Sequence, residues 1–282
     1  MKLRYWSSMI FAVACLVGLG MLATTSAPAQ EQAKQGKGKG KRPPEPPDPR
    51  QSQAVPKLPN GHPDLGGVWD HPRTGDLGKE ARGCVGQTPG CSWVPDGPVP
   101  FTEFGKAEQT KEHFDYGVHC LPWGYVRSWG TPYPLQIVQT NDVFAILFEQ
   151  NNMFHIVPTM PGAAFPPDME PTWMGQSIGH WEGDTLVVET KGFNGVTWLD
   201  TAPETPAQET TSVMEKFTRP DFTHLVKEMT ITDPKMYSKP WHGVMTNVLM
   251  KPGQDHILEY SCDENNKEVV EGHVTDIWTK KK

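Results

Sequence analysis

The sequence predicts an all-β protein: a single antiparallel up-and-down β-barrel of about 8–10 strands with long N-terminal loops. Short runs of β-branched and aromatic residues recur, and turn residues end each of them. No stretch keeps apolar residues at helical spacing for three turns. The chain also has 28 prolines, 27 glycines and 10 tryptophans, a composition typical of short strands joined by turns. A β-sandwich is the main alternative.

The strands are expected to follow one another along the chain, with tight turns at Asn141-Asp142 and at Glu182-Gly183-Asp184. The expected strands are 65–69, 135–140, 143–150, 153–158, 177–181, 185–191, 210–218, 223–232, 241–250, 256–262 and 268–278. Only residues 104–116 favour a helix, and weakly. A meander of this length hides its edges by closing on itself, and the barrel then encloses a cavity lined by alternate residues of each strand.

Residues 1–29 resemble a cleavable signal peptide. Lys2 and Arg4 precede an apolar run over 9–23, which ends at the small-x-small pattern Ala27-Pro28-Ala29. A membrane anchor is the less favoured alternative, because the run is shorter than the roughly 20 apolar residues of a spanning helix and no basic flank follows at once. A lipoprotein is also less favoured, since Ala12 stands where such a signal needs Leu. The expected location is therefore periplasmic or secreted.

Residues 30–58 are expected to form a disordered linker, Lys/Gly-rich and then Pro-rich, with the barrel domain at 59–282. The linker is a solubilising spacer or a weak electrostatic contact to an anionic envelope surface. The net charge is −7, and many basic residues lie in the linker and in the C-terminal Lys280-Lys281-Lys282. The folded body is therefore acidic and offers nucleic acid no basic face.

Four cysteines remain once the leader is removed: Cys84, Cys91, Cys120 and Cys262. An even number in an oxidising compartment indicates two disulfides. Cys84 and Cys91 share one loop whose glycines and proline permit a tight ring, which leaves Cys120 to pair with Cys262. A metal site is the alternative, but no CxxC or HxH spacing supports one. No metal and no cofactor are expected.

Three ionisable residues are candidates for acid–base catalysis. Glu149 ends an apolar strand, and if it points inward its pKa is raised toward neutrality. Glu189 lies on one face of the strand 185–191, and either face could be the lumen. His242 shares a strand face with Val244 and is a lumen proton shuttle or a satisfied core histidine. For Glu149, a strand-end carboxylate that reaches water is the alternative.

Five further residues are candidates for ligand binding. Asn194, Trp198 and Asp200 follow a strand and could cover the mouth of a barrel, and turn chemistry with a packed tryptophan is the favoured alternative. Tyr237 and Trp241 could stack on a flat ligand, and core packing is their alternative. Two hypotheses follow: a barrel that binds a small, mostly apolar or aromatic molecule, and a cofactor-independent lyase, isomerase or hydrolase. The oligomeric state is left open.

Two resemblances accompany these patterns. Gly67-Val68-Trp69 near the start of the barrel resembles the Gly-x-Trp signature of lipocalins and other calycins, whose last strand carries a partner arginine. Here that segment, 277–280, reads Ile-Trp-Thr-Lys, without an arginine.

A broader likeness covers most of the domain. Segments 63–69, 120–122, 136–140, 173–179 and 259–262 resemble a large group of exported bacterial proteins, as do Trp-Glu-Gly-Asp-Thr-Leu-Val-Val-Glu-Thr at 181–190 and Gly-Phe-Asn at 192–194. In that group positions equivalent to Cys120 and Cys262 recur, as do those of Asn194, Trp198 and Asp200. The resemblance implies secretion and a shared fold, and it implies no reaction.

Overall fold

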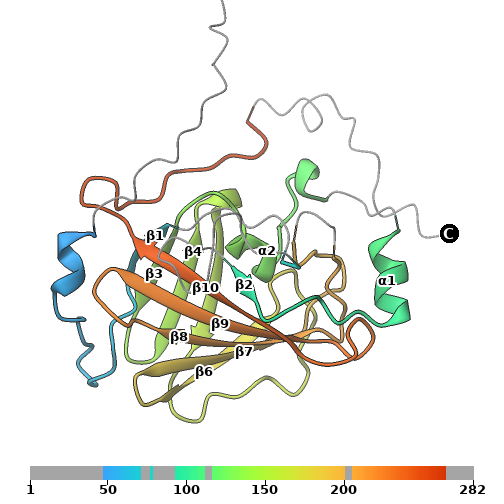
Figure 1. Ribbon diagram of the computed structural model, residues 1–282, viewed down its shortest axis with the longest axis horizontal. Helices are drawn as coiled ribbons and strands as arrows, with labels where there is room; N and C mark the ends of the chain where they lie inside the picture. Colours follow the sequence, from blue (N-terminus) through green and yellow to red (C-terminus); the bar gives the residue numbers. More distant parts are fainter. Residues whose placement is uncertain (1–46, 71–76, 79–92, 112–115, 201–204, 265–282) are drawn as a thin grey trace, which may run out of the picture. The chain divides into compact units, whose positions relative to one another are not determined.

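The computed structural model describes residues 47–70, 77–78, 93–111, 116–200 and 205–264 (Figure 1). In this part of the chain, nine strands form one antiparallel meander with the order β5-β4-β3-β1-β10-β9-β8-β7-β6. Their bounds are β1 Gly67–Asp70, β3 Leu135–Gln139, β4 Val143–Phe148, β5 Met153–Pro158, β6 Gln176–Glu182, β7 Thr185–Lys191, β8 Ser212–Thr218, β9 His224–Thr232 and β10 Trp241–Leu249. A tenth strand, β2 (Val94–Pro95), pairs with β10 outside this path. The predicted all-β barrel is confirmed.

The barrel is nearly closed, and its geometry explains where it stays open. β1 pairs with β3 on one side and with β10 on the other, so the first and last strands of the meander meet. Every pair along the path is antiparallel, and because nine is an odd number, the end strands β5 and β6 run in the same direction. These two strands are in contact but do not continue the hydrogen-bonded order. We call this contact the seam.

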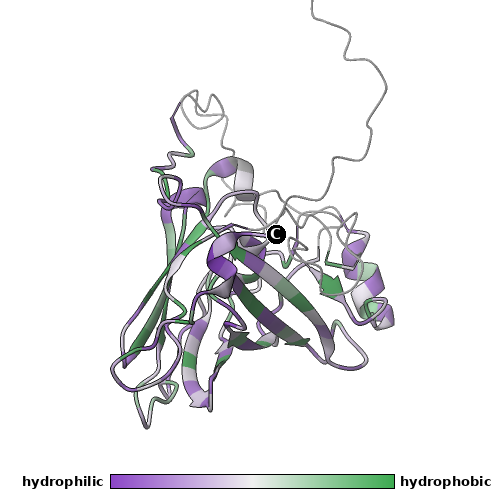
Figure 2. Ribbon diagram, turned by 60° about the vertical axis from the view of Figure 1, so that its left-hand side comes forward, coloured by the Kyte–Doolittle hydropathy of each residue, from purple (hydrophilic) through white to green (hydrophobic). Residues whose placement is uncertain are grey.

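The alternation of burial along the strands matches the period of two on which the strand predictions rest. β8 and β9 alternate between buried and exposed positions along most of their length. Figure 2 shows the corresponding bands of hydrophobic and hydrophilic residues along the strands. The inward side chains form one hydrophobic core that includes Trp69, Phe144 and Phe217, each of them fully buried.

Glycine is required at one place in this core. Gly243 lies on the inner face of β10, where the ring of Trp93 packs directly on its backbone. A Cβ atom at this position would lie 2.3 Å from Cζ2 of Trp93, so a larger residue would displace the tryptophan. The indole nitrogen of Trp93 donates a 2.7 Å hydrogen bond to the carbonyl of Leu77, which fixes the ring.

Helices are few and short. α1 (Glu103–Gln109) lies within the predicted helix 104–116 except for its first residue, and it is shorter. α2 (Tyr125–Trp129) was not predicted, and all five of its residues are buried. The 3-10 turns are η1 (Pro49–Ser52), η2 (Tyr116–His119) and η3 (Gln150–Asn152). None of the helices in the described ranges is long and apolar enough to cross a membrane.

Trp69 of the Gly-x-Trp motif packs against an arginine. The guanidinium of Arg219, just after β8, lies 5.0 Å from the ring centre of Trp69. Its Nη1 donates hydrogen bonds to the carbonyls of Asp64 (2.6 Å) and Gly66 (3.2 Å). This arginine comes from the β8–β9 turn, whereas the segment in which the sequence lacks an arginine, 277–280, lies outside the described residues.

The expected linker is longer than the structure allows. Residues 1–46 lie outside the described residues, but residues 47–58 are part of the folded unit. The guanidinium of Arg50 in η1 donates hydrogen bonds to the carbonyls of Leu249 and Met250, at the end of β10. The domain therefore begins at about Pro47 and not at residue 59.

The C-terminal segment differs from the prediction. Residues 256–262 are not a strand, while the expected strand 268–278 lies outside the described residues. Cys262 forms a disulfide with Cys120, with a Cα–Cα distance of 5.5 Å across a sequence separation of 142, which confirms this predicted pair. Cys84 and Cys91 lie outside the described residues.

Candidate functional site

An ion pair lies inside the barrel. Glu215 on β8 and Lys227 on β9 both point inward, and both side chains are 0% exposed. Because Glu215 pairs with Met229 and Lys227 pairs with Phe217, the two charged residues are diagonal neighbours on one face of the sheet. Nζ of Lys227 lies 3.0 Å from Oε1 of Glu215. Burial of two charges is unfavourable unless they are paired, and here they are.

α2 places two aromatic side chains against this pair. The hydroxyl of Tyr125 donates a 2.5 Å hydrogen bond to Oε2 of Glu215, and Nζ of Lys227 lies 3.8 Å from the ring centre of Trp129. Burial raises the pKa of Tyr125, and the charge of Glu215 raises it further. Burial lowers the pKa of Lys227 to about 8, although Glu215 acts in the opposite direction. The amine therefore loses its proton closer to neutral pH than an ordinary lysine.

A second polar group bridges the seam. Nε2 of His155 on β5 lies 2.6 Å from Oγ of Ser177 on β6, and this oxygen lies 2.6 Å from Oγ1 of Thr190 on β7. The ring of Tyr125 packs on the imidazole with 4.3 Å between the centres. Burial lowers the pKa of His155 to about 4, so the imidazole is neutral at pH 7. These side chains join the two strands where the hydrogen-bonded order ends.

Asn247 adds an amide to the interior. Its side chain on the inner face of β10 is 0% exposed, and within the described structure neither its oxygen nor its nitrogen has a hydrogen-bond partner. A buried polar group without a partner costs about 1–3 kcal/mol. Such a group is a candidate for contact with a ligand.

The interior next to β2 is aromatic. Trp241, at the start of β10, packs on Trp93 (5.9 Å between ring centres) and on Tyr237 (6.0 Å), and Tyr237 packs on Phe101. We call these four residues the aromatic end. The hydroxyl of Tyr237 and the indole nitrogen of Trp241 are buried, and neither has a hydrogen-bond partner among the described residues. Burial raises the pKa of Tyr237, and so do the nearby carboxylates of Asp200 and Asp233.

The other ligand-binding candidates have structural contacts. The ring of Trp198 packs on Tyr116 and lies 4.7 Å from the guanidinium of Arg127. The carboxylate of Asp200 accepts hydrogen bonds from the backbone nitrogens of Leu77 and Thr205. Asn194 accepts one from the nitrogen of Val196, which makes a local turn. Of the five predicted residues, only Tyr237 and Trp241 have buried polar atoms without partners among the described residues. Asp200 acts on Tyr237 through its charge.

The three predicted catalytic residues do not converge. Glu149 is buried at one end of the barrel, where it accepts a 2.8 Å hydrogen bond from the backbone nitrogen of Leu258. Glu189 lies on the outer face of β7, 3.6 Å from Lys191, with 38% of its side chain exposed. His242 lies on the outer face of β10, 2.9 Å from Asp96.

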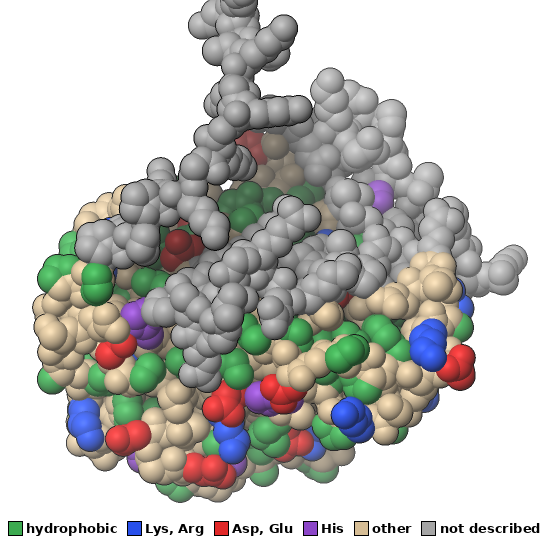
Figure 3. All heavy atoms as spheres, in the orientation of Figure 1, with side chains coloured by type: hydrophobic (Ala, Val, Ile, Leu, Met, Phe, Trp, Pro, Cys, Tyr) green, Lys and Arg blue, Asp and Glu red, His purple; other side chains and the backbone are tan. Residues whose placement is uncertain are grey.

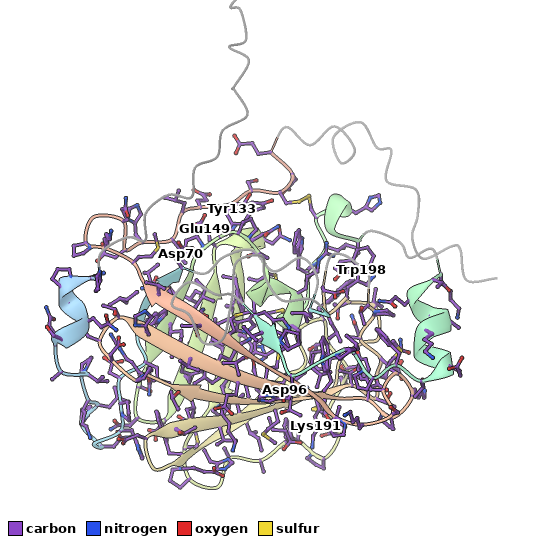
Figure 4. The ribbon with its side chains drawn as sticks, in the orientation of Figure 1. Asp70, Asp96, Tyr133, Glu149, Lys191 and Trp198 are labelled. Carbon is purple, nitrogen blue, oxygen red and sulfur yellow. A yellow bond between two sulfur atoms is a disulfide. The ribbon has the colours of Figure 1, made fainter. Side chains whose placement is uncertain are left out.

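Figure 4 shows Glu149 with Asp70 and Tyr133 at the upper end of the barrel, far from Asp96 and Lys191. The same end is hollowed in the space-filling view, and hydrophobic side chains lie in the hollow (Figure 3). Three separate locations cannot form one acid–base site, so the predicted catalytic set is not brought together.

Sequence reasoning missed the interior pair, although a signal was present. Glu215 lies two residues from both Val213 and Phe217, and Lys227 lies two residues from both Leu225 and Met229. A charged residue in phase with the apolar positions of two consecutive strands predicts an inward pair. In the described part of the chain, no group of three or more His, Cys, Asp or Glu residues has the arrangement of a metal site.

The fold and this interior define a calycin-like β-barrel with a buried ion pair and an aromatic end. No protein-family model, curated protein or solved structure matches the chain.

Proposed function

We propose that the protein is an exported β-barrel that binds a small, mostly apolar or aromatic molecule at the aromatic end. The observation that carries this proposal is the presence of two buried donors without partners, Oη of Tyr237 and Nε1 of Trp241, on neighbouring rings. Aromatic walls with a few polar groups are typical of small-molecule sites. The sequence leader and a disulfide suited to an oxidising compartment support export.

The chemistry of the aromatic end defines the class of ligand. A hydroxyl and an indole N–H both donate, so the ligand carries an acceptor such as a carbonyl oxygen or a ring nitrogen. Asp200 and Asp233 act on Tyr237 with negative charge, which disfavours an anionic ligand. An uncharged, planar molecule with one acceptor satisfies both conditions. Nucleic acid is not a proposed partner, and the basic segment of the linker remains a proposed weak contact to the envelope surface.

A fluorescent ketone, 6-propionyl-2-(dimethylamino)naphthalene, tests this proposal. We expect it to bind the full-length mature protein with a blue-shifted emission. Tyr237→Phe removes one donor and keeps the ring, so the Kd should rise about 3- to 10-fold, the value of one neutral hydrogen bond. Trp241→Phe should weaken binding in the same direction. Without ligand, Tyr237→Phe should leave the Tm unchanged or raise it, because no hydrogen bond is lost.

Tyr133→Phe is the matched control, because Tyr133 lies at the opposite, upper end beside Glu149. Its Kd should equal that of the wild type. Equal affinity of the wild type and Tyr237→Phe, or tighter binding of the anionic 1-anilinonaphthalene-8-sulfonate than of the ketone, would overturn the proposed site.

A cofactor-independent lyase, isomerase or hydrolase is the second candidate function. The Tyr125–Glu215–Lys227 cluster favours it, because three ionisable groups lie within hydrogen-bond reach in the barrel interior. Glu149, Glu189 and His242 do not contribute to this cluster.

A further inference from the structure

We infer that Lys227 is a reactive amine that binds aldehydes covalently, as an imine, inside the barrel. The inference goes beyond the proposed function, because it needs neither Tyr237 nor Trp241. It starts from a group that the aromatic end does not use: a fully buried primary amine with a carboxylate on one side and an indole face on the other.

The surroundings of the amine match the needs of imine formation. A neutral amine is the nucleophile, and burial lowers the pKa of Lys227 to about 8, which increases the neutral fraction at pH 7.5. Oε1 of Glu215, 3.0 Å from Nζ, is placed to accept the ammonium proton. Tyr125 donates to the other carboxylate oxygen and holds the group in place.

Asn247 supplies a place for the carbonyl oxygen. Met245 on β10 pairs with Lys227 on β9, and Asn247 pairs with Leu225, so Asn247 and Lys227 are diagonal neighbours on the inner face. Diagonal neighbours are about 7–8 Å apart, so the two side chains reach the same region of the interior. The unpartnered side-chain N–H of Asn247 can donate to the carbonyl oxygen.

The reaction is balanced without a further reactant. Glu215 takes a proton from the ammonium, and the neutral amine attacks the carbonyl carbon. A C–N bond forms while the C=O π bond breaks, and a proton moves from the new cationic nitrogen to the oxygen, which becomes a hydroxyl. Glu215 returns a proton to this hydroxyl, which leaves as water while the C=N bond forms. One amine and one aldehyde give one imine and one water, and nothing is oxidised or reduced. When the imine is protonated, the carboxylate of Glu215 and the ring of Trp129 stabilise its charge.

Reductive trapping tests the inference. The mature wild-type protein is incubated at pH 7.5 with benzaldehyde and sodium cyanoborohydride, which reduces an imine to a stable benzyl amine, and the modified lysines are mapped by mass spectrometry. Lys216 is the internal control, because it is exposed on the outer face of the same sheet, next to Glu215 in sequence. We expect Lys227 to be benzylated about tenfold faster than Lys216, less than its lower pKa alone would give, because the site is buried.

Modification of exposed lysines with Lys227 unmodified would overturn the inference, and so would no modification at all. Glu215→Gln should slow labelling of Lys227 about tenfold or more and leave Lys216 unchanged. If that variant does not fold, the map of modified lysines in the wild-type protein still tests the inference. Tyr237→Phe should label Lys227 like the wild type, so a failure at the aromatic end and a failure at Lys227 are distinguished.

Discussion

At the scale of single residues, the buried imidazole of His155 makes the stability of the protein depend on pH. It is buried against Tyr125 and Ser177, and its pKa falls from 6.5 to about 4. Between these two pH values the unfolded chain binds a proton at this position that the folded protein does not bind. The contribution of His155 to the free energy of unfolding is therefore fully present above about pH 6.5 and is lost as the pH falls toward 4.

We expect the free energy of unfolding to fall by about 3 kcal/mol between pH 6.5 and pH 4 on account of His155. In His155→Gln this contribution to the slope should disappear. Chemical denaturation at a series of pH values measures it, with His180→Gln as control, since 64% of the His180 side chain is exposed. Identical slopes for the wild type and His155→Gln would show that His155 is not held neutral.

The sequence alone singles out some of the candidate site residues, but for others it cannot tell which face of the sheet they lie on. Tyr237 and Trp241 were found because aromatic residues beside a turn are candidates for stacking, and the structure leaves their polar atoms without partners. Glu189 and His242 could not be assigned to a face, because alternation tells which residues share a face and not which face is buried. For β10 that choice was made by Trp241, Met245 and their neighbours packing inward.

At the scale of elements, the strands were predictable and the short buried pieces were not. β5 and β7 have the predicted bounds, because a period of two and adjacent turn residues specify them locally. α2 has only five residues, too few for a periodic signal, and burial of all five against the barrel stabilises it. Tertiary packing therefore determines this helix.

The segment expected to form a strand at 256–262 instead lies along the end of the barrel. Glu149 accepts from the nitrogen of Leu258, the amide of Asn152 pairs with the backbone of Tyr260, and Tyr133 packs on the ring of Tyr260. We call residues 256–263 the strap. Its backbone bonds to side chains and not to a neighbouring strand, which no alternation of residues can reveal.

The disulfide fixes the end of the strap, and its removal should loosen it. In the double variant Cys120→Ser, Cys262→Ser, hydrogen exchange at the amides of Leu258 and Tyr260 should accelerate. The loop-entropy value for a sequence separation of 142 is about 4–5 kcal/mol, so the free energy of unfolding should fall by roughly this amount. Unchanged exchange at both amides would show that Glu149 and Asn152 hold the strap without the disulfide.

At the scale of the whole molecule, the odd number of strands has a structural consequence. The strands expected from the sequence predict a closed meander. Whether its two end strands run parallel or antiparallel depends on whether the number of strands on the hydrogen-bonded path is odd or even. Eight antiparallel pairings along nine strands leave β5 and β6 parallel. His155, Ser177 and Thr190 join this short parallel contact, which has no ladder of backbone hydrogen bonds. This polar bridge connects the two strands of the seam, whereas Glu215, Lys227 and Asn247 lie on strands that already share a hydrogen-bonded ladder.

The indole N–H signals of the tryptophans report whether an uncharged acceptor binds at the aromatic end. In 1H–15N spectra of the mature protein, the Nε1–H signal of Trp241 should move downfield when the naphthyl ketone is added, because its donor gains a partner. The signal of Trp93, already bonded to the carbonyl of Leu77, should move much less. We expect a saturable shift of the Trp241 signal. A Trp241 signal that stays in place while the ketone binds would contradict it.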